Sequence, residues 1–188
     1  MKGKRYTTAG MYRSLFATTI GFGGVVAGED GLIEVFPPFA GENKDEMVAR
    51  IALLYPLAAI ENQVTRKAAL LLQKYFAGVQ VSFDLPIYRR GFTPFQSAVY
   101  EAVSDIPYGR VKSYGEIASQ IGCPRSARGV GAAMAHNPLP IIIPCHRVVG
   151  ASGGLTGYSA PGGIMSKKWL LLLEGVAVRG KTAQEFSK

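Results

Sequence analysis

The first half of the chain contains four stretches in which apolar residues recur at regular intervals. Two apolar runs within residues 15–36 flank a Gly-Glu-Asp-Gly turn, a pattern typical of a β-hairpin. Residues 42–55 and 62–76 carry apolar side chains at spacings of three and four, which predicts two helices. Strict alternation from 79 to 85 predicts a further strand. We therefore expect a small α/β unit, and nothing in it points to catalysis.

A change in composition near residue 88 divides the chain. Residues 86–94 are rich in Pro, Arg and Gly, so we place a linker there, between an N-terminal domain of residues 1–88 and a C-terminal domain of residues 89–188. The first carries nine Lys/Arg and eight Asp/Glu, and the second carries twelve and five, within a total net charge of +8. On charge alone, a domain that contacts a polyanion and a merely basic soluble protein are equally good interpretations.

The second half has clear helix start and stop signals. Capping boxes at Thr93–Gln96 and Ser113–Glu116 predict the starts of two helices, and Gly122 ends the second. After a tight turn, another helix is expected at 126–136. Two short helices joined by a glycine-containing turn are the pattern of a helix-turn-helix, so we expect a mostly α domain that contains one.

The helix expected at 126–136 is unusual in its small residues. Gly129 and Gly131 each cost about 1 kcal/mol relative to alanine in a helix. One interpretation is close packing against another helix. The other, which the charge distribution favours, is a smooth face that approaches a DNA backbone, with Arg128 as its long side chain.

The main chemical signal is Cys145. It follows a short buried strand expected at Ile141–Ile143 and precedes His146 and Arg147. A buried cysteine is usually a small apolar residue, but a neighbouring base or positive charge can activate a thiol. Adjacent side chains on a strand point to opposite faces, so contact between Cys145 and His146 requires a turn or a bridging water.

These residues belong to a series of motifs that resembles one protein family. The run PCHRVVG is preceded by SYGEIASQIG, SARGVGAAMAHNP and NPLPIII, and it is followed by GYS and KKWLLLLEG. In this order they are similar to the O6-alkylguanine-DNA alkyltransferases, closely over residues 93–175 and loosely over the first half. The resemblance implies a ribonuclease-H-like α/β N-terminal domain and a mostly α C-terminal domain with a winged helix-turn-helix.

The resemblance also implies an activity and its catalytic residues. The activity is DNA repair by irreversible, stoichiometric transfer of an alkyl group from O6 of guanine to Cys145, with O4 of thymine as a second candidate substrate. His146 matches the base that deprotonates the thiol through a water, and Glu174, in the last helix, matches the carboxylate that orients His146. Asn137 matches the residue that braces the adjacent turn. Without the resemblance, Glu174 would be interpreted as a solvent-exposed residue at the end of a helix, and Asn137 as the cap of the preceding helix.

Further matching residues are implied to bind DNA or the damaged base. Tyr114 matches the proton donor to the guanine ring, although alone it reads as a surface tyrosine. Arg128 matches the side chain that fills the space left by a flipped nucleotide, and it shares a DNA-binding helix with Ser126 and Ala127. The loop that closes over the flipped base is matched by Tyr158 and Ser159.

The chain departs from the family pattern in one loop, and it offers few metal ligands. GYSAPGGIMSKKW carries extra residues before the last helix, which changes the lid of the pocket. The two Cys and two His all lie beyond residue 120, so we expect no metal and no cofactor. Without a long apolar stretch, no membrane span is expected. We expect a monomer that binds double-stranded DNA containing O6-alkylguanine from the minor groove, in the cytoplasm or, in a eukaryote, the nucleus.

Three other functions compete with this one. A DNA-binding sensor would recognise alkylated bases without repairing them, but such relatives lack the acceptor cysteine. A helix-turn-helix regulator would use Cys145 only structurally. A turnover thiol hydrolase is permitted by the Cys-His-Glu set, but it leaves the basic helix-turn-helix unexplained.

Overall fold

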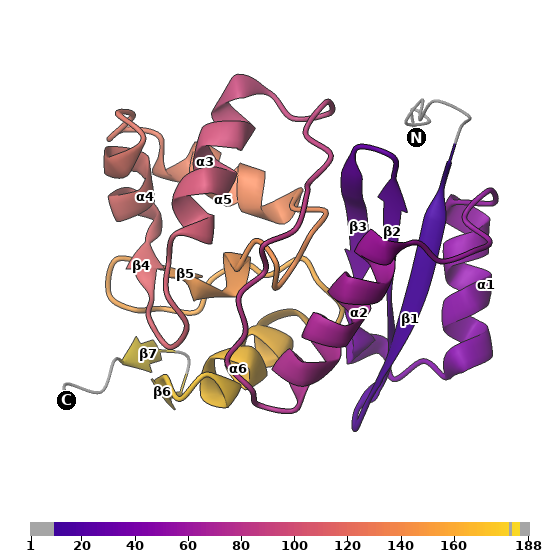
Figure 1. The fold of residues 1–188 in the computed structure, drawn as a ribbon. Helices are drawn as coiled ribbons and strands as arrows, with labels where there is room; N and C mark the ends of the chain where they lie inside the picture. Colours follow the sequence, from indigo (N-terminus) through magenta and orange to yellow (C-terminus); the bar gives the residue numbers. More distant parts are fainter. Residues whose placement is uncertain (1–9, 181, 185–188) are drawn as a thin grey trace.

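The first half of the molecule is built on a three-stranded antiparallel sheet. The computed structural model describes residues 10–180 and 182–184. The sheet has the order β1-β2-β3, formed by Tyr12–Thr18, Gly21–Gly28 and Gly31–Phe36 (Figure 1). The hairpin predicted around the Gly-Glu-Asp-Gly turn is present as β2 and β3, but the first apolar run forms two strands rather than one, because it contains a turn of its own. The Thr18 hydroxyl stabilises that turn by donating to the carbonyl of Gly21 (2.8 Å).

Two helices cover opposite faces of this sheet. Helix α1 (Lys44–Leu54) packs Met47 and Ile51 against one face, where Val26 lies. Helix α2 (Gln63–Phe76) packs against the other face, where Val25 lies. Neighbouring residues of a strand point to opposite faces, so β2 is buried on both sides. Both helices were predicted within two residues of their bounds. In the chain, the short 3₁₀ helix η1 (Pro38–Ala40) connects β3 to α1.

The segment 79–85, which was predicted to be a strand, follows an irregular path instead. The alternation is real, since Val81, Phe83 and Leu85 are half-buried against the core while the residues between them are exposed. Here the alternation reflects burial of one side of the segment. Among the described residues, the segment has no neighbouring strand with which to form a sheet. The next residues are joined to β3 through the backbone of Leu32. The amide of Leu32 donates to the carbonyl of Pro86 (2.8 Å), and its carbonyl accepts from the amide of Tyr88 (2.9 Å).

The second half consists mainly of four helices, of which the start and stop signals predict the first three and the family resemblance implies the last. These are α3 (Pro94–Ser104), α4 (Tyr114–Gln120), α5 (Ala127–Ala135) and α6 (Gly163–Leu173). Both predicted capping boxes are present, at Thr93 and at Ser113. Two small sheets accompany the helices: β4 (Lys112–Ser113) pairs in parallel with β5 (Val148–Val149), and β6 (Ala177–Arg179) pairs antiparallel with β7 (Thr182–Gln184).

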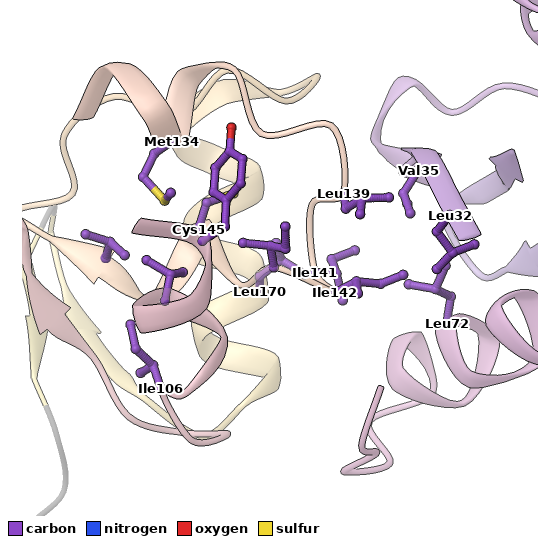
Figure 2. Close-up of a cluster of buried hydrophobic side chains, with 14 of the residues drawn as sticks. Leu32, Val35, Leu72, Ile106, Met134, Leu139, Ile141, Ile142, Cys145 and Leu170 are labelled. Carbon is purple, nitrogen blue, oxygen red and sulfur yellow. The ribbon is translucent and has the colours of Figure 1, made fainter. Parts of the chain in front are cut away.

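The two halves share one apolar core. Leu32 and Leu72 of the first half face Ile142 of the second (Figure 2). The amide of Val35 also donates to the carbonyl of Pro138 (2.9 Å), so β3 is tied to the loop after α5. This core fixes α2 and β3 against the segment that leads into Cys145.

Candidate active site

A strained turn, rather than the predicted strand, leads into Cys145. Ile141 has φ 78°, a left-handed conformation that is costly for a β-branched residue, at about 1–3 kcal/mol. The turn is closed by the amide of Ile143, which donates to the carbonyl of Leu139 (2.8 Å). Asn137 braces it by donating from Nδ2 to the carbonyl of Ile143 (2.9 Å) and accepting at Oδ1 from the amide of Leu139 (3.0 Å). The Ile141 side chain is buried in the shared core, and this burial offsets the backbone strain.

Cys145, His146 and Arg147 form a single 3₁₀ turn, η2, and all three are buried. The amide of Cys145 donates to the carbonyl of Ile143 (2.7 Å), and that of Arg147 donates to Pro144 (2.9 Å). The requirement for a turn, inferred from the adjacency of Cys145 and His146, is therefore met. Their side chains no longer have to face opposite sides as they would on a strand.

The Glu174 carboxylate lies at the centre of a buried hydrogen-bond network. Its Oε1 is 2.8 Å from Nε2 of His146 and accepts from the hydroxyl of Tyr75 (2.6 Å). Arg147 donates to both oxygens (2.9 Å each), and the amide of Gly109 donates to Oε2 (3.1 Å). Glu174 is the residue directly after α6 rather than part of it. It is buried, so the solvated interpretation is wrong.

This network sets the charge states of Glu174 and His146. Burial alone would raise the pKa of Glu174, but the hydrogen bonds and charges of His146 and Arg147 hold it well below its ordinary value. Burial lowers the pKa of His146, and Glu174 opposes this only in part. Neutral His146 therefore donates from Nε2 to Glu174. Its Nδ1 is buried and has no hydrogen-bond partner among the described residues, which leaves it available to accept a proton.

Burial raises the pKa of the Cys145 thiol, and several groups counteract it. The Asn137 side chain hydrogen-bonds the thiol, Lys167 contributes a positive charge, and the amides of Cys145 and His146 also favour the thiolate. Asn137 thus both braces the turn and contacts the sulfur.

Lys167 is a site residue that the sequence analysis missed. Its side chain is fully buried, and its Nζ donates to the carbonyls of Val148 (2.5 Å) and Thr156 (3.4 Å). Burial lowers the pKa of Lys167 to about 8, while Cys145 raises it. The signal was present in the helical phase, since Lys167 precedes the buried Leu170 and Leu171 by three and four residues. A lysine on the buried stripe of a helix is rare unless it has partners.

Cys145 opens onto a cavity of about 610 Å³. The cavity is also lined by predicted site residues from α4, α5 and the loop before α6: Tyr114, Ala127, Arg128, Tyr158 and Ser159. Arg128 and Ser159 are exposed at its edge, whereas Ser126 precedes α5 and does not line it. The structure therefore brings both predicted substrate-binding residues, and all the predicted DNA-binding residues except Ser126, to one pocket.

Two tyrosine hydroxyls in this pocket differ in their bonding. Tyr114 donates to the carbonyl of Thr156 (3.0 Å). The Tyr158 hydroxyl is buried and forms no well-aligned hydrogen bond within the described residues. Burial raises the pKa of Tyr158 well above its ordinary value, and the adjacent Cys145 raises it further. Burial also raises the pKa of Tyr114, so both tyrosines stay protonated at neutral pH and can act as donors.

The two glycines of α5 serve different purposes. A Cβ on Gly129 would lie 3.1 Å from the ring of Phe95 in α3, so this glycine allows close packing of two helices. Gly131 faces Tyr114 and lines the cavity. The close-packing interpretation, which the sequence analysis disfavoured, is therefore correct for Gly129.

The described residues contain neither a metal cluster nor a membrane-spanning helix. Within residues 10–180 and 182–184, no group of three or more His, Cys, Asp or Glu side chains is placed to hold a metal ion. No helix in the same residues has both the length and the apolar character needed to span a bilayer.

Comparison with known proteins gives the family. The model of the "6-O-methylguanine DNA methyltransferase, DNA binding domain" matches residues 94–176. A methylated-DNA–protein-cysteine methyltransferase of Methanosarcina acetivorans is 41% identical over 166 residues, which are 88% of this chain and 99% of that protein. The chain belongs to this methyltransferase family.

Solved structures of the family agree with the fold. The crystal structure of the Mycobacterium tuberculosis O6-methylguanine methyltransferase superposes with a TM-score of 0.68 at 38% identity, covering 87% of this chain and 92% of that one. The M. tuberculosis protein in complex with DNA superposes with a TM-score of 0.66 at 39% identity and the same coverage. The two-part α/β architecture expected from the sequence is confirmed.

Proposed function

We propose that this methyltransferase repairs DNA by transferring an alkyl group from O6 of guanine to Sγ of Cys145, irreversibly and once per molecule. The observation that carries the proposal is the position of Cys145, at the pocket and beside the buried His146–Glu174 pair. An alkyl group on O4 of thymine is bonded to a ring in the same way, and it is the second substrate to test.

The transfer begins with loss of the thiol proton. His146 Nδ1 takes this proton through a water, while Nε2–H stays bonded to Glu174. The sulfur then bonds to the alkyl carbon as the bond from that carbon to O6 breaks, and the electron pair remains with the guanine. A proton on the guanine ring neutralises it, so the proton lost by the thiol is balanced by one gained by the base.

Tyr114 and Lys167 assist at the two ends of this reaction. Tyr114 donates to the guanine ring, exchanging its bond to Thr156 for one to the base. Lys167 favours the thiolate by its charge. Tyr158 and Ser159 form the side of the pocket that closes over the flipped base, and the protonated hydroxyl of Tyr158 faces the sulfur.

Helices α4 and α5 form the proposed helix-turn-helix. In this arrangement α5 enters the minor groove, Ser126 and Ala127 contact the backbone, and Arg128 fills the space of the flipped nucleotide. The support is the position of Arg128 and Ala127 at the rim of the cavity. We further propose a winged second domain, a ribonuclease-H-like first domain, and a monomer that acts without a cofactor wherever the cell keeps its DNA, in the cytoplasm or the nucleus.

The decisive test is mass analysis after incubation with a duplex that contains O6-methylguanine. One methyl group on the Cys145 peptide, absent in Cys145→Ser, supports the proposal. Cys123 is the other free cysteine and serves as an internal control. Binding of the lesion without any protein methylation would favour a sensor or a regulator, and release of methyl groups with turnover would favour a hydrolase.

A further inference from the structure

We infer that Tyr75, from α2 in the first half of the chain, is a positioning residue of the relay that activates Cys145. This inference rests on the proposed function. It assigns to the first half a direct part in the site, although the sequence pattern of that half contains nothing catalytic.

The hydroxyl of Tyr75 lies between the two members of the relay. It donates to Glu174 Oε1 (2.6 Å) and lies 3.2 Å from His146 Nε2, which is itself 2.8 Å from the same Oε1. The three polar atoms thus form a closed triangle. All three side chains are buried, so solvent does not compete for these bonds.

The proton positions in this triangle follow from what each atom can do. The Glu174 carboxylate only accepts, so the proton of the Tyr75 hydroxyl points to Oε1. A lone pair of the Tyr75 oxygen is then left to face His146 Nε2. Both neighbours of Nε2 are therefore acceptors, which favours the tautomer with the proton on Nε2. That tautomer leaves Nδ1 as the basic atom, as the proposed reaction requires.

Tyr75 remains a donor over the whole functional pH range. Burial raises its pKa well above the ordinary value, Glu174 raises it further, and Arg147 opposes this only in part. The other titratable groups around the triangle are Tyr108 and Tyr158 near Tyr75, and Lys167 near His146.

The position of the hydroxyl is fixed by packing in the first half. The Tyr75 ring contacts those of Phe76, Phe83 and Tyr108, at centroid distances of 5.7, 6.3 and 6.2 Å. One turn earlier on α2, Leu72 faces the segment that leads to Cys145 (Figure 2). A shift of α2 would therefore move the hydroxyl away from Glu174 and His146.

Removing the hydroxyl should change the relay in a defined direction. The bond to Oε1 is shorter than the contact with Nε2 and is made to a charge, so its loss dominates. Without it, the carboxylate becomes more basic and stabilises the protonated form of His146 more strongly. The pKa of His146 should rise, and the acid limb of the pH–rate profile of alkyl transfer should move to higher pH. The plateau rate should fall about tenfold, the effect of losing one hydrogen bond to a charged group.

The test compares Tyr75→Phe with Tyr55→Phe. Tyr55 is a matched control, because it is also a buried tyrosine whose hydroxyl donates to a glutamate, Glu34, but it lies in the separate apolar cluster beneath α1. Transfer rates are measured against pH, DNA affinity is measured at neutral pH, and the two histidines are titrated by ¹⁵N NMR with exposed His136 as the reference.

The inference predicts a slower plateau, an upward shift of the acid limb and of the His146 titration, and unchanged DNA affinity, for Tyr75→Phe alone. An unchanged pH profile would overturn it, whatever the rate. If Tyr75→Phe does not fold, 3-fluorotyrosine at position 75 provides the test. Its hydroxyl is more acidic and donates more strongly to Glu174, so the pKa of His146 should fall. An unchanged pKa of His146 would overturn the inference. The titration does not require transfer, so failure of the wild-type protein to transfer would instead count against the proposed function.

Discussion

Arg147 binds both carboxylate oxygens of Glu174: Nε donates to Oε2 and Nη2 donates to Oε1, each at 2.9 Å. The third nitrogen of Arg147, Nη1, donates to the carbonyl of Ile106 (2.6 Å), so all three nitrogens of the guanidinium donate to protein groups. Its charge is therefore directed at Glu174 rather than at the Cys145 thiol. The positive neighbour that the PCHR motif places beside the cysteine therefore binds the carboxylate that is hydrogen-bonded to His146.

We predict that Glu174→Gln lowers the stability of the protein as well as its rate. Breaking a buried ion pair leaves a charge uncompensated and costs about 3 kcal/mol. The pKa of Glu174 is lowered in the folded state, so its contribution is complete above its ordinary value of 4.5 and is lost as the pH falls below it. Urea unfolding at several pH values should therefore show a gap between wild type and variant that narrows below about pH 4.5. A gap independent of pH would contradict this.

Both Glu174→Gln and His146→Ala should slow transfer and leave DNA affinity nearly intact. Neither side chain reaches the surface, so neither can contact DNA directly. Single-turnover rates and equilibrium binding to the same duplex separate the two effects. If either variant chiefly weakened binding, the relay assignment would fail.

Lys167→Met should slow transfer by about tenfold at neutral pH, because a neighbouring cation lowers a thiol pKa by about one unit or more. The pKa of Lys167 is about 8, so the wild-type residue itself loses this charge in mildly alkaline solution. The ratio of wild-type to variant rates should therefore shrink above pH 8. Lys168→Met is the matched control, since the neighbouring side chain is only half-buried and should leave the rate unchanged. A ratio that stays constant with pH would contradict the electrostatic role.

Arg128→Ala should impair repair in duplex DNA about tenfold or more, and leave the reaction with free O6-benzylguanine nearly unchanged. A free base needs neither unstacking nor a side chain to fill its place. Arg125→Ala is the control, because it removes an exposed charge just before α5 that does not line the cavity. It should weaken DNA affinity without lowering the rate at saturating DNA. Equal losses of Arg128→Ala on both substrates would refute the assigned role.

The sequence predicted those elements that are determined by local interactions. The capping boxes at Thr93 and Ser113 depend on residues three positions apart, and both are present. The alternation at residues 79–85 was misleading because a strand also needs a partner, which a local pattern cannot supply. Ile141–Ile143 has high β propensity, yet the bonds from Asn137 and burial in the core hold it in a turn.

The same distinction applies to the site. Cys145, His146 and Asn137 could be singled out as candidates because they lie in one continuous motif. Tyr75 lies within the helix predicted at 62–76, but its bond to Glu174 joins residues 99 positions apart, and no local pattern indicates it. Lys167 was overlooked because lysine is normally exposed, although its helical phase placed it on the buried stripe. Contacts between the two halves join residues far apart in the chain and leave no pattern in the local sequence, so they could not be predicted.

Finally, each molecule should react once, and the alkylated protein should be less stable than the free one. A thioether is a poor leaving group toward water, so His146 cannot release the alkyl group as it could release an acyl group from a thioester. Labelled O6-methylguanine duplex titrated against a fixed amount of protein should give a plateau at one methyl group per active molecule. Several turnovers per molecule would instead support the hydrolase interpretation.

The loss of stability follows from packing. Cys145 is buried in the same core as Ile141 and Leu170, so an added group overpacks it, at a typical cost of about 1–3 kcal/mol. The thermal unfolding midpoint should fall after reaction, and more for a benzyl than for a methyl group; a stability that does not depend on the size of the group would show that the cavity of about 610 Å³ absorbs it without strain.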